Sequence, residues 1–404
     1  MVKIKFLTLK DMDLENKKVL VRVDYNVSIK NGMVEDDTRL KASIPTINKL
    51  LEKHCKIILM SHLGRPSELL KKGKSFGEVK KELTLMPVAE DLADILGMEV
   101  ILAEDSIGLD SVSTHLPEGD IILLENIQFN RGETKNDDKF AKQLASLADI
   151  YVNDGFGQSH REYASFCAIT KHLPSCAGLL VEKEAKELSK ILNPQRPFVA
   201  IVAGAKSDKI GALRLLAKKA DKILIGGVLA NTFLKAKGCD IGASKFDEGT
   251  FAVADEIMNV AGEKIKLPSD SVIADSFDND AKTKIARTGE IPDGWMALDI
   301  GPETVISYKN ELKDAKTILW AGPLGVFEME KFSAGTKEIG HFIGSLNAVK
   351  IVGGGDSAAA VNSFNLVEKM THVSTGGGAS LEFIEKEGKL PALIALDNCC
   401  NRPK

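Results

Sequence analysis

The sequence predicts an α/β protein made of two halves, each a parallel sheet flanked by helices. Two observations carry this prediction. Short apolar runs without polar alternation recur along the whole chain, as is typical of strands that are buried on both faces. Amphipathic segments of helical period separate these runs, which is the pattern of α/β folds. The length of 404 residues corresponds to two or three domains at about 150 residues per domain.

The first half contains four predicted strands and two clear helices. The strands are Val19–Val23, Lys56–Met60, Ile121–Leu124 and Asp149–Val152. Apolar side chains three and four residues apart predict a helix between Leu40 and Leu51. The same spacing predicts a second helix that begins near Pro87 and ends at Gly97.

The second half begins after an amphipathic segment at 181–192. An apolar stripe runs along this segment, its other positions are mostly charged, and Pro194 follows its end. These features fit equally a helix that connects two domains and an ordinary surface helix. The strands predicted beyond it are Phe198–Val202, Lys222–Ile225, Thr317–Trp320 and Val349–Val352.

Composition excludes several classes of protein. Lys plus Arg number 53 and Asp plus Glu 57, so the net charge is 53 − 57 = −4, which argues against a general nucleic-acid binder. No apolar run approaches the ~20 residues of a membrane helix. The first ten residues alternate lysine with apolar residues and do not form a signal peptide. We therefore expect a cytoplasmic protein without a membrane or nucleic-acid partner.

The residues after the predicted strands differ between the halves. Charged residues follow the strands of the first half: Asp24, His62, Arg65 and Arg161. Glycines follow those of the second half, at 226–227, 353–355 and 376–378. Ligands of open parallel sheets bind outside the carboxyl ends of the strands. The first half is therefore expected to bind a small anion, and the second half a phosphate chain.

The glycines at 353–355 lie between a strand and a helix start, where backbone N–H groups attract phosphate. Gly353, Gly355 and Ala358 also satisfy the dinucleotide pattern G-x-G-x-x-[G/A], which leaves an NAD-dependent oxidoreductase as an alternative. The next strand lacks the acidic residue that this pattern expects. Asp356 would repel a polyphosphate unless a cation bridged them, which favours a Mg²⁺–nucleotide complex.

Phosphoryl transfer is the chemistry that the remaining polar residues favour. Lys206 and Lys209 follow a predicted strand, where a lysine can reach a nucleotide phosphate. The chain has neither a P-loop motif nor the protein-kinase motif set, and no Ser-His-Asp arrangement is visible. Phosphoryl transfer depends mainly on positioning and charge stabilisation, which fits that pattern.

Seven ordered stretches, spread over nearly the whole chain, resemble those of the phosphoglycerate kinase family. They lie at 21–27, 61–66, 124–129, 152–161, 322–328, 353–356 and 372–380. The resemblance implies a monomeric kinase with two Rossmann-like lobes that transfers the acyl phosphate of 1,3-bisphosphoglycerate to ADP, reversibly. It implies an N-terminal domain 1–175 for 3-phosphoglycerate or 1,3-bisphosphoglycerate and a C-terminal domain 193–386 for Mg-ADP or Mg-ATP. A hinge helix at 182–192 would join them, with the tail 387–404 packing back on the first domain.

The resemblance also implies a role for individual residues. The triose-acid ligands would be Asp24, Asn26, Arg39, His62, Arg65, Gln128 and Arg161. The nucleotide ligands would be Lys206, Lys209, Gly227, Glu328, Gly353, Gly354, Gly355, Asp356 and Ser357. Arg39, Lys206 and the Gly377 amide would stabilise the migrating phosphoryl group, and Asp356 would hold Mg²⁺.

Four positions depart from the family pattern. Gln128 stands where the family usually has an arginine, and losing a charge-assisted hydrogen bond typically costs ~1.5–3 kcal/mol. Our hypothesis is that Arg131 compensates for it. Val228 and Ala321 replace a common glycine and asparagine, and the loop 205–209 is one residue shorter than usual. A non-catalytic relative that still binds nucleotide therefore remains a second alternative.

Overall fold

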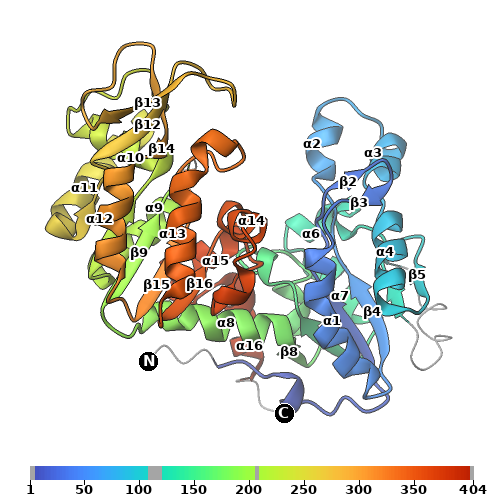
Figure 1. The fold of residues 1–404 in the computed structure, drawn as a ribbon. Coiled ribbons are helices and arrows are strands. Elements are labelled where there is room, and N and C mark those ends of the chain that lie inside the picture. The colour runs from blue at the N-terminus through green and yellow to red at the C-terminus, as the bar shows by residue number, and fades with distance from the viewer. Residues whose placement is uncertain (1–4, 108–120, 205–208, 401–404) are drawn as a thin grey trace. The chain divides into compact units, whose positions relative to one another are not determined.

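The computed structural model describes residues 5–107, 121–204 and 209–400, apart from the side chain of Cys400 (Figure 1). Two compact units make up the chain. The N-terminal unit spans Lys3–Lys186 together with Gly388–Lys404, and the C-terminal unit contains Glu187–Glu387. The boundary at Lys186 lies within helix α8 (Leu179–Leu192). Among the described residues, none of the helices is both long and apolar enough to span a membrane.

A six-stranded parallel sheet forms the centre of the N-terminal unit, in the order β5-β6-β4-β1-β7-β8. The strands are β1 (Lys18–Arg22), β4 (Lys56–Met60), β5 (Val100–Leu102), β6 (Ile121–Leu123), β7 (Ile150–Asn153) and β8 (Ser175–Ala177). The four strands predicted here are all present and parallel. The strands β5 and β8 were not predicted, because three residues at a sheet edge carry little periodic signal.

Helices surround this sheet, and α1, α4 and α16 pack against its strands. The helices of the unit are α1 (Thr38–Leu51), α2 (Pro66–Lys71), α3 (Phe76–Glu82), α4 (Met86–Leu96), α6 (Arg131–Thr134), α7 (Asp138–Ala145) and α16 (Pro391–Cys400). The single-turn helices are η1 (Leu9–Asp11), η2 (Ile127–Phe129), η3 (Phe156–Gln158) and η4 (Ala168–Lys171). Both predicted helices are confirmed, and Gly97 ends α4 in the left-handed conformation that favours glycine (φ 65°).

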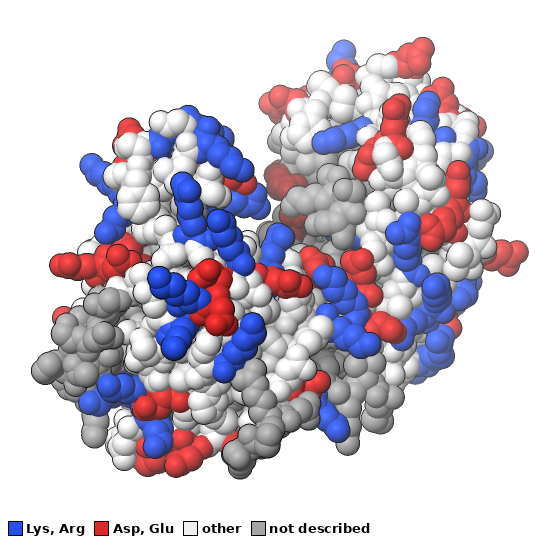
Figure 2. All heavy atoms as spheres, turned by 180° about the vertical axis from the view of Figure 1, so that it is seen from behind, with Lys and Arg blue, Asp and Glu red and all other residues white. Residues whose placement is uncertain are grey.

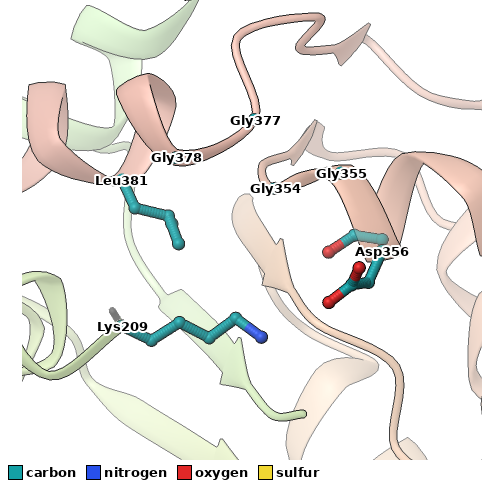
Figure 3. A pocket seen from close by; sticks show the side chains of 8 residues that line it. Lys209, Gly354, Gly355, Asp356, Gly377, Gly378 and Leu381 are labelled. Atoms are coloured by element: carbon teal, nitrogen blue, oxygen red, sulfur yellow. The ribbon is translucent and has the colours of Figure 1, made fainter. Parts of the chain in front are cut away.

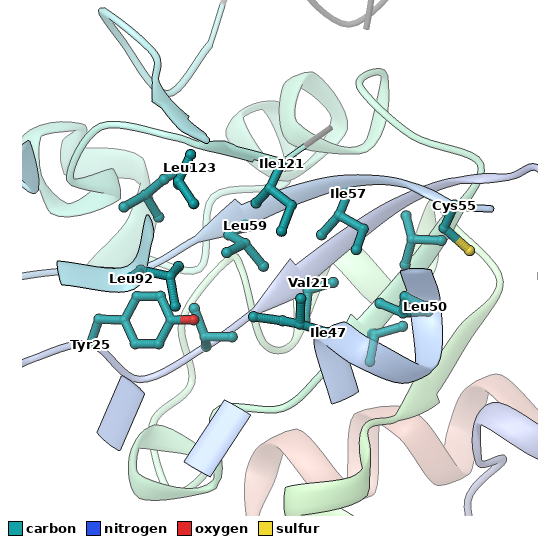
Figure 4. Packing of buried hydrophobic residues seen from close by; sticks show 14 of the residues in the cluster. Val21, Tyr25, Ile47, Leu50, Cys55, Ile57, Leu59, Leu92, Ile121 and Leu123 are labelled. Carbon is teal, nitrogen blue, oxygen red and sulfur yellow. The ribbon is translucent and has the colours of Figure 1, made fainter. Parts of the chain in front are cut away.

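The core of the N-terminal unit lies between the sheet and its helices. Figure 4 shows Val21 and Leu59 of the sheet facing Ile47 of α1 and Leu92 of α4. All four side chains are wholly buried. Burying a side chain of this size stabilises the fold by about 1.5–3 kcal/mol. The same packing fixes where β1 and β4 end, and therefore where the residues that follow them lie.

A second six-stranded parallel sheet organises the C-terminal unit, in the order β11-β10-β9-β15-β16-β17. Its strands are β9 (Phe198–Val202), β10 (Lys222–Ile225), β11 (Ile265–Lys266), β15 (Thr317–Ala321), β16 (Val349–Val352) and β17 (His372–Val373). Its helices are α9 (Ile210–Lys219), α10 (Gly227–Ala236), α11 (Phe251–Ala261), α12 (Pro302–Leu312), α13 (Ala334–Ser345), α14 (Gly355–Ser363) and α15 (Gly378–Glu385). The single-turn helices are η6 (Glu248–Thr250), η7 (Gly262–Lys264), η8 (Glu330–Phe332) and η9 (Val367–Lys369). The four strands predicted here are confirmed.

An antiparallel sheet interrupts the parallel pattern of the C-terminal unit. Its order is β13-β12-β14, and its strands are β12 (Asp270–Ala274), β13 (Thr283–Arg287) and β14 (Met296–Ile300). Strand β13 was not predicted, because four of its five side chains are exposed and give no apolar run. β12 and β14 were missed because the buried polar residues Asp270, Ser271 and Asp299 interrupt their apolar pattern. A short hairpin, β2 (Ile29–Lys30) with β3 (Met33–Val34), was missed in the N-terminal unit for lack of length.

Candidate active site

The loop after β1 carries an acidic side chain that holds a basic one in place. Arg39 Nη1 lies 2.9 Å from Asp24 Oδ2 and donates to the Asn26 carbonyl at 3.2 Å. Asp24 is nearly buried, whereas the Arg39 side chain keeps 34% of its surface exposed. Arg39 lies in the first turn of α1, so this helix and the loop after β1 together fix the position of its guanidinium. This arrangement presents a positioned cation at the carboxyl edge of the sheet.

The loop after β4 is fastened to the loop after β1. Gly64 N donates to Asn26 Oδ1 at 2.8 Å, so the Asn26 side chain bridges the two loops. His62 is buried, with its Nδ1 3.3 Å from Arg22 Nη2. Burial, followed by the charge of Arg22, lowers the pKa of His62 to about 3. His62 is therefore neutral at physiological pH and contributes hydrogen bonds rather than charge.

The other predicted triose-acid ligands belong to the same edge of the sheet. Arg65 precedes α2, is well exposed and pairs with Glu68 at 2.8 Å. Gln128 lies in η2. Asn126, just before this helix, sets its position, because Asn126 Nδ2 donates to the Leu63 carbonyl at 2.8 Å. Arg161 is exposed on the turn after β7, the strand beside β1. The topology thus brings all seven predicted ligands to one edge.

In the C-terminal unit, the glycine loop after β16 leads directly into α14, as expected. Gly354 adopts φ +97°, which glycine tolerates and other residues rarely do. The Ser357 hydroxyl donates to the Gly353 carbonyl at 2.9 Å and accepts from Gly322 N at 2.5 Å. Ser357 therefore fastens this loop to the loop after β15, and its hydroxyl is engaged within the protein.

A cavity of about 210 Å³ opens at this loop (Figure 3). It is lined by Lys209, Gly354, Gly355, Asp356, Ser357, Gly377, Gly378 and Leu381. Figure 3 shows Lys209 and Asp356 extending toward one another across it. The Lys209 ammonium donates to the Ala203 carbonyl at 2.5 Å, which directs this buried side chain along the cavity.

Two helices begin at the cavity wall. Gly355 is the first residue of α14, and Gly378 is the first residue of α15. The N-terminus of a helix has unpaired N–H groups and the positive end of the helix dipole, so it attracts phosphate. Two such ends, one lysine and one carboxylate fit a polyphosphate with a bound cation, because a carboxylate alone would repel the phosphates.

The sequence matches the phosphoglycerate kinase family over residues 9–388. It is 48% identical over 397 residues to phosphoglycerate kinase of Moorella thermoacetica, covering 96% of this chain and 98% of that protein. Against phosphoglycerate kinase of Trichodesmium erythraeum it is 47% identical over 407 residues, covering 98% and 100%. The chain belongs to the phosphoglycerate kinase family. Its activity is accordingly that of a glycolytic phosphotransferase with a carboxyl group as acceptor.

Solved structures of phosphoglycerate kinases share the fold. The enzyme from Coxiella burnetii superimposes with a TM-score of 0.84 at 38% identity, covering 98% of this chain and 99% of that one. The enzyme from Pyrococcus horikoshii gives the same TM-score and coverage at 30% identity. The two-lobed α/β architecture predicted from sequence is confirmed, and the alternative of an NAD-dependent oxidoreductase is wrong.

Three further residues predicted to bind nucleotide lie outside the lining of this cavity as the structure describes it. Gly227 begins α10 at φ +61° and packs so closely on Gly204 that a Cβ would lie 2.8 Å from the Gly204 nitrogen. Glu328 is exposed on the loop after β15. Lys206 lies outside the described residues.

Two residues at these sites were not predicted. Leu381 is buried and forms an apolar wall of the cavity, a role for which a helical leucine gives no sequence signal. Arg22 contacts His62 from inside the fold. A signal did exist for Arg22, because it is a charge within a strand that is otherwise apolar on both faces.

Proposed function

We propose that the N-terminal unit binds 3-phosphoglycerate or 1,3-bisphosphoglycerate, that the C-terminal unit binds Mg-ADP or Mg-ATP, and that phosphate passes reversibly between them. One observation carries the nucleotide half of this proposal. The helices α14 and α15 begin at the same cavity, opposite Lys209 and beside Asp356. That set of groups complements a phosphate chain and its cation.

The triose acid binds at the carboxyl edge of the N-terminal sheet. Arg39, Arg65 and Arg161 supply positive charge, and a guanidinium can bind a carboxylate or phosphate in bidentate fashion. Asn26 and His62 supply neutral hydrogen-bonding groups. Asp24 holds Arg39 in place through the 2.9 Å ion pair, so that the guanidinium is preorganised before the substrate arrives.

Asp356 fits the magnesium ion that the family implies. Mg²⁺ prefers oxygen ligands and is usually held by one or two carboxylates together with substrate phosphates and water. The structure supplies one carboxylate at the cavity, next to two helix N-termini where phosphates would lie. When bound, the ion would neutralise charge on the nucleotide phosphates. Lys209 and the backbone N–H groups of Gly354 and Gly355 would orient those phosphates.

The transferring group needs stabilisation from both units. Arg39 from the N-terminal unit, with Lys206 and the Gly377 amide from the C-terminal unit, would bind its oxygens as charge develops. Because these groups belong to different units, in-line transfer requires the units to close on one another. The segment 182–192 within α8 would serve as the hinge between domains 1–175 and 193–386, with the tail 387–404 on the first.

The proposal also includes the oligomeric state, the location and the partners of the protein. We expect a monomer in the cytoplasm, without a nucleic-acid or membrane partner. The charge distribution supports the part of this expectation that concerns nucleic acid: Figure 2 shows acidic and basic side chains mixed over much of the face that it displays. Electrostatic binding of nucleic acid usually needs a clustered basic surface.

A coupled assay tests the proposal. Purified protein with Mg²⁺, ATP and 3-phosphoglycerate is expected to drive NADH consumption through glyceraldehyde-3-phosphate dehydrogenase. The Lys206→Ala variant is expected to lose turnover while still binding ATP. Absence of turnover in the unmodified protein, with ATP binding retained, would instead support the non-catalytic alternative and direct attention to the short loop 205–209.

A further inference from the structure

A chain of buried polar groups leads inward from His62. Arg22 Nη2 lies 3.3 Å from His62 Nδ1, and Arg22 Nε donates to Ser165 Oγ at 2.9 Å. Ser165 Oγ in turn donates to Glu133 Oε1 at 2.6 Å, and Ser165 N donates to Glu133 Oε2 at 3.0 Å. Arg22, Ser165 and Glu133 are wholly buried. The residues come from β1, from the segment after η3 and from α6, so the chain connects three elements of the N-terminal unit.

The hydrogen-bonding capacity of these groups determines where the protons lie. A guanidinium has only donors, so His62 Nδ1 must be the acceptor of the contact with Arg22. A neutral imidazole that accepts at Nδ1 carries its proton on Nε2. Ser165 Oγ accepts from Arg22, so its own proton is directed to Glu133. These contacts are satisfied when His62 is neutral with its proton on Nε2 and Arg22 is charged, while Glu133 accepts both bonds from Ser165.

The surroundings hold the guanidinium in one orientation. Arg22 also donates to the carbonyls of Val23 and Met60, and its guanidinium lies 4.6 Å from the centre of the Phe166 ring. Backbone acceptors, an aromatic face and the Ser165 hydroxyl leave little freedom of rotation. Among the described residues, His62 Nε2 has no hydrogen-bond partner, so its N–H remains available to a ligand.

We propose that Arg22, Ser165 and Glu133 are positioning residues that keep His62 as a neutral Nε2–H donor for an anionic oxygen of the triose acid. This inference rests on the proposed binding of that substrate beside His62. Glu133 supplies the countercharge without which Arg22 would be an uncompensated buried cation. The exposed cations then attract the substrate, while His62 contributes one directed hydrogen bond.

The charges around His62 agree with this assignment. Burial and then Arg22 lower the pKa of His62, with smaller lowering effects from Arg39 and Arg65, while Asp24 alone raises it. Burial raises the pKa of Glu133, and Arg22 opposes that change. A His62 cation would therefore face several cations across the same edge of the sheet, which is why the neutral form is favoured.

Nuclear magnetic resonance of the histidine side chains tests the inference on the full chain. The protein has seven histidines, and the spectrum of the His62→Gln variant identifies the His62 signals. With ¹⁵N-labelled histidine, we expect His62 to show an unprotonated Nδ1 and a protonated Nε2, unchanged between pH 5.5 and 8. In Ser165→Ala and Glu133→Gln we expect a mixture of tautomers or a titration within that range.

A matched control separates this effect from the loss of any buried hydroxyl. Ser175 is buried in the same unit, but within the described part of the chain its hydroxyl bonds only to the Leu173 carbonyl, at 2.8 Å. Ser175→Ala is therefore expected to leave the His62 signals unchanged. The inference is overturned if unmodified His62 is protonated on Nδ1 or charged in this range. It is equally overturned if Ser165→Ala and Glu133→Gln both keep the original tautomer.

Steady-state kinetics link the tautomer to substrate binding. Ser165→Ala and Glu133→Gln should raise KM for 3-phosphoglycerate by about three- to tenfold, the loss expected for one hydrogen bond, and leave KM for ATP unchanged. Ser175→Ala should change neither. If His62→Gln leaves KM for 3-phosphoglycerate unaltered, the placement of the substrate is wrong, whatever the tautomer. If His62→Gln raises KM but the two positioning variants do not, the positioning role is wrong.

Discussion

Asp154 Oδ1 accepts a hydrogen bond from the backbone N–H of Leu180 at 2.9 Å, which joins the loop after β7 to the first turn of α8. Thr46 Oγ1, from α1, accepts from the neighbouring Leu179 N at 2.9 Å. Two side chains from distant parts of the sequence thus cap the helix that continues into the C-terminal unit. A carboxylate at a helix N-terminus is stabilised by the helix dipole. Asp154 is nevertheless wholly buried, and burial raises its pKa to about 7.

The raised pKa of Asp154 predicts a pH dependence of stability. Between about pH 4 and pH 7 the folded state keeps a proton on Asp154 that the unfolded state has lost, so stability falls as the pH rises through this range. Asp154→Asn removes this dependence while its amide oxygen can still cap α8. As the pH rises through this range, the unfolding free energy of the variant should increase relative to that of the unmodified protein by up to about 1.4 kcal/mol per pH unit. Urea denaturation at several pH values measures this difference. Parallel pH profiles of the two proteins would contradict this prediction.

His62 should give a pH dependence of the opposite sign. Its pKa of about 3 in the folded protein lies below the ordinary histidine value, so below about pH 6.5 the unfolded state binds a proton that the folded state does not. Stability is therefore lost as the pH falls through this window. In His62→Gln the loss on acidification should be smaller, by about 1.4 kcal/mol per pH unit between pH 4 and 6. An unchanged slope on urea denaturation would show that His62 titrates normally in the folded state.

Asp356 is expected to link nucleotide affinity to magnesium. In the unmodified protein, ADP should bind more tightly with Mg²⁺ than after its removal by a chelator, because Asp356 would help to hold the proposed ion beside the phosphates. Asp356→Asn should reduce this difference by tenfold or more, about 1.4 kcal/mol. Isothermal titration of both proteins, with and without Mg²⁺, measures the coupling. Asp280→Asn, on an exposed loop, serves as control and should retain the full magnesium effect. Equal coupling in all three proteins would place the ion elsewhere.

Buried parallel strands were the part of the fold most open to prediction. Lys56–Met60 and Phe198–Val202 are apolar on both faces, and burial on both faces is the physical reason for that pattern. Strand β13 escaped prediction, because its exposed positions accept polar and apolar residues alike. Its neighbours β12 and β14 escaped because the buried polar residues Asp270 and Asp299 interrupt an apolar run. Local pattern thus reveals a strand when its buried side chains are apolar, and fails when they are polar or when solvent covers the strand.

In the candidate site, too, some residues could be predicted from the sequence and others could not. Arg39 and Asp356 follow directly from topology, since residues after parallel strands or at helix starts gather at one edge of a sheet. The internal hydrogen bonds of Ser357 were not predictable, because they depend on the loop after β15, 35 residues away. The series of hydrogen bonds from His62 through Arg22 and Ser165 to Glu133 was not predictable either, because it joins residues 71 positions apart (133 − 62). Such contacts follow from tertiary packing and leave only an isolated sign, such as the charge of Arg22 within an apolar strand.

Gln128 offers the clearest test of substrate affinity, because the resemblance to the family implies an arginine at this position. Its backbone N–H donates to Asn126 Oδ1 at 3.1 Å, and Asn126 is itself bonded to Leu63 and Leu83, so the backbone of η2 is held independently of the Gln128 side chain. Gln128→Arg should therefore add a guanidinium without displacing the loop. A new charge-assisted bond is worth about 1.5–3 kcal/mol, so KM for 3-phosphoglycerate should fall, by tenfold or more if no other cation already supplies this bond.

Arg131 decides how large that gain is. It is exposed in the first position of α6, three residues after Gln128, and is our candidate for supplying the missing charge. If it does so, Arg131→Ala should raise KM for 3-phosphoglycerate about tenfold in the unmodified background and much less in Gln128→Arg, where its contribution is redundant. Lys135→Ala, an exposed cation just beyond α6, should change KM in neither background. Equal effects of Arg131→Ala in both backgrounds would mean that the two positions act independently, and no effect in either would leave Gln128 uncompensated.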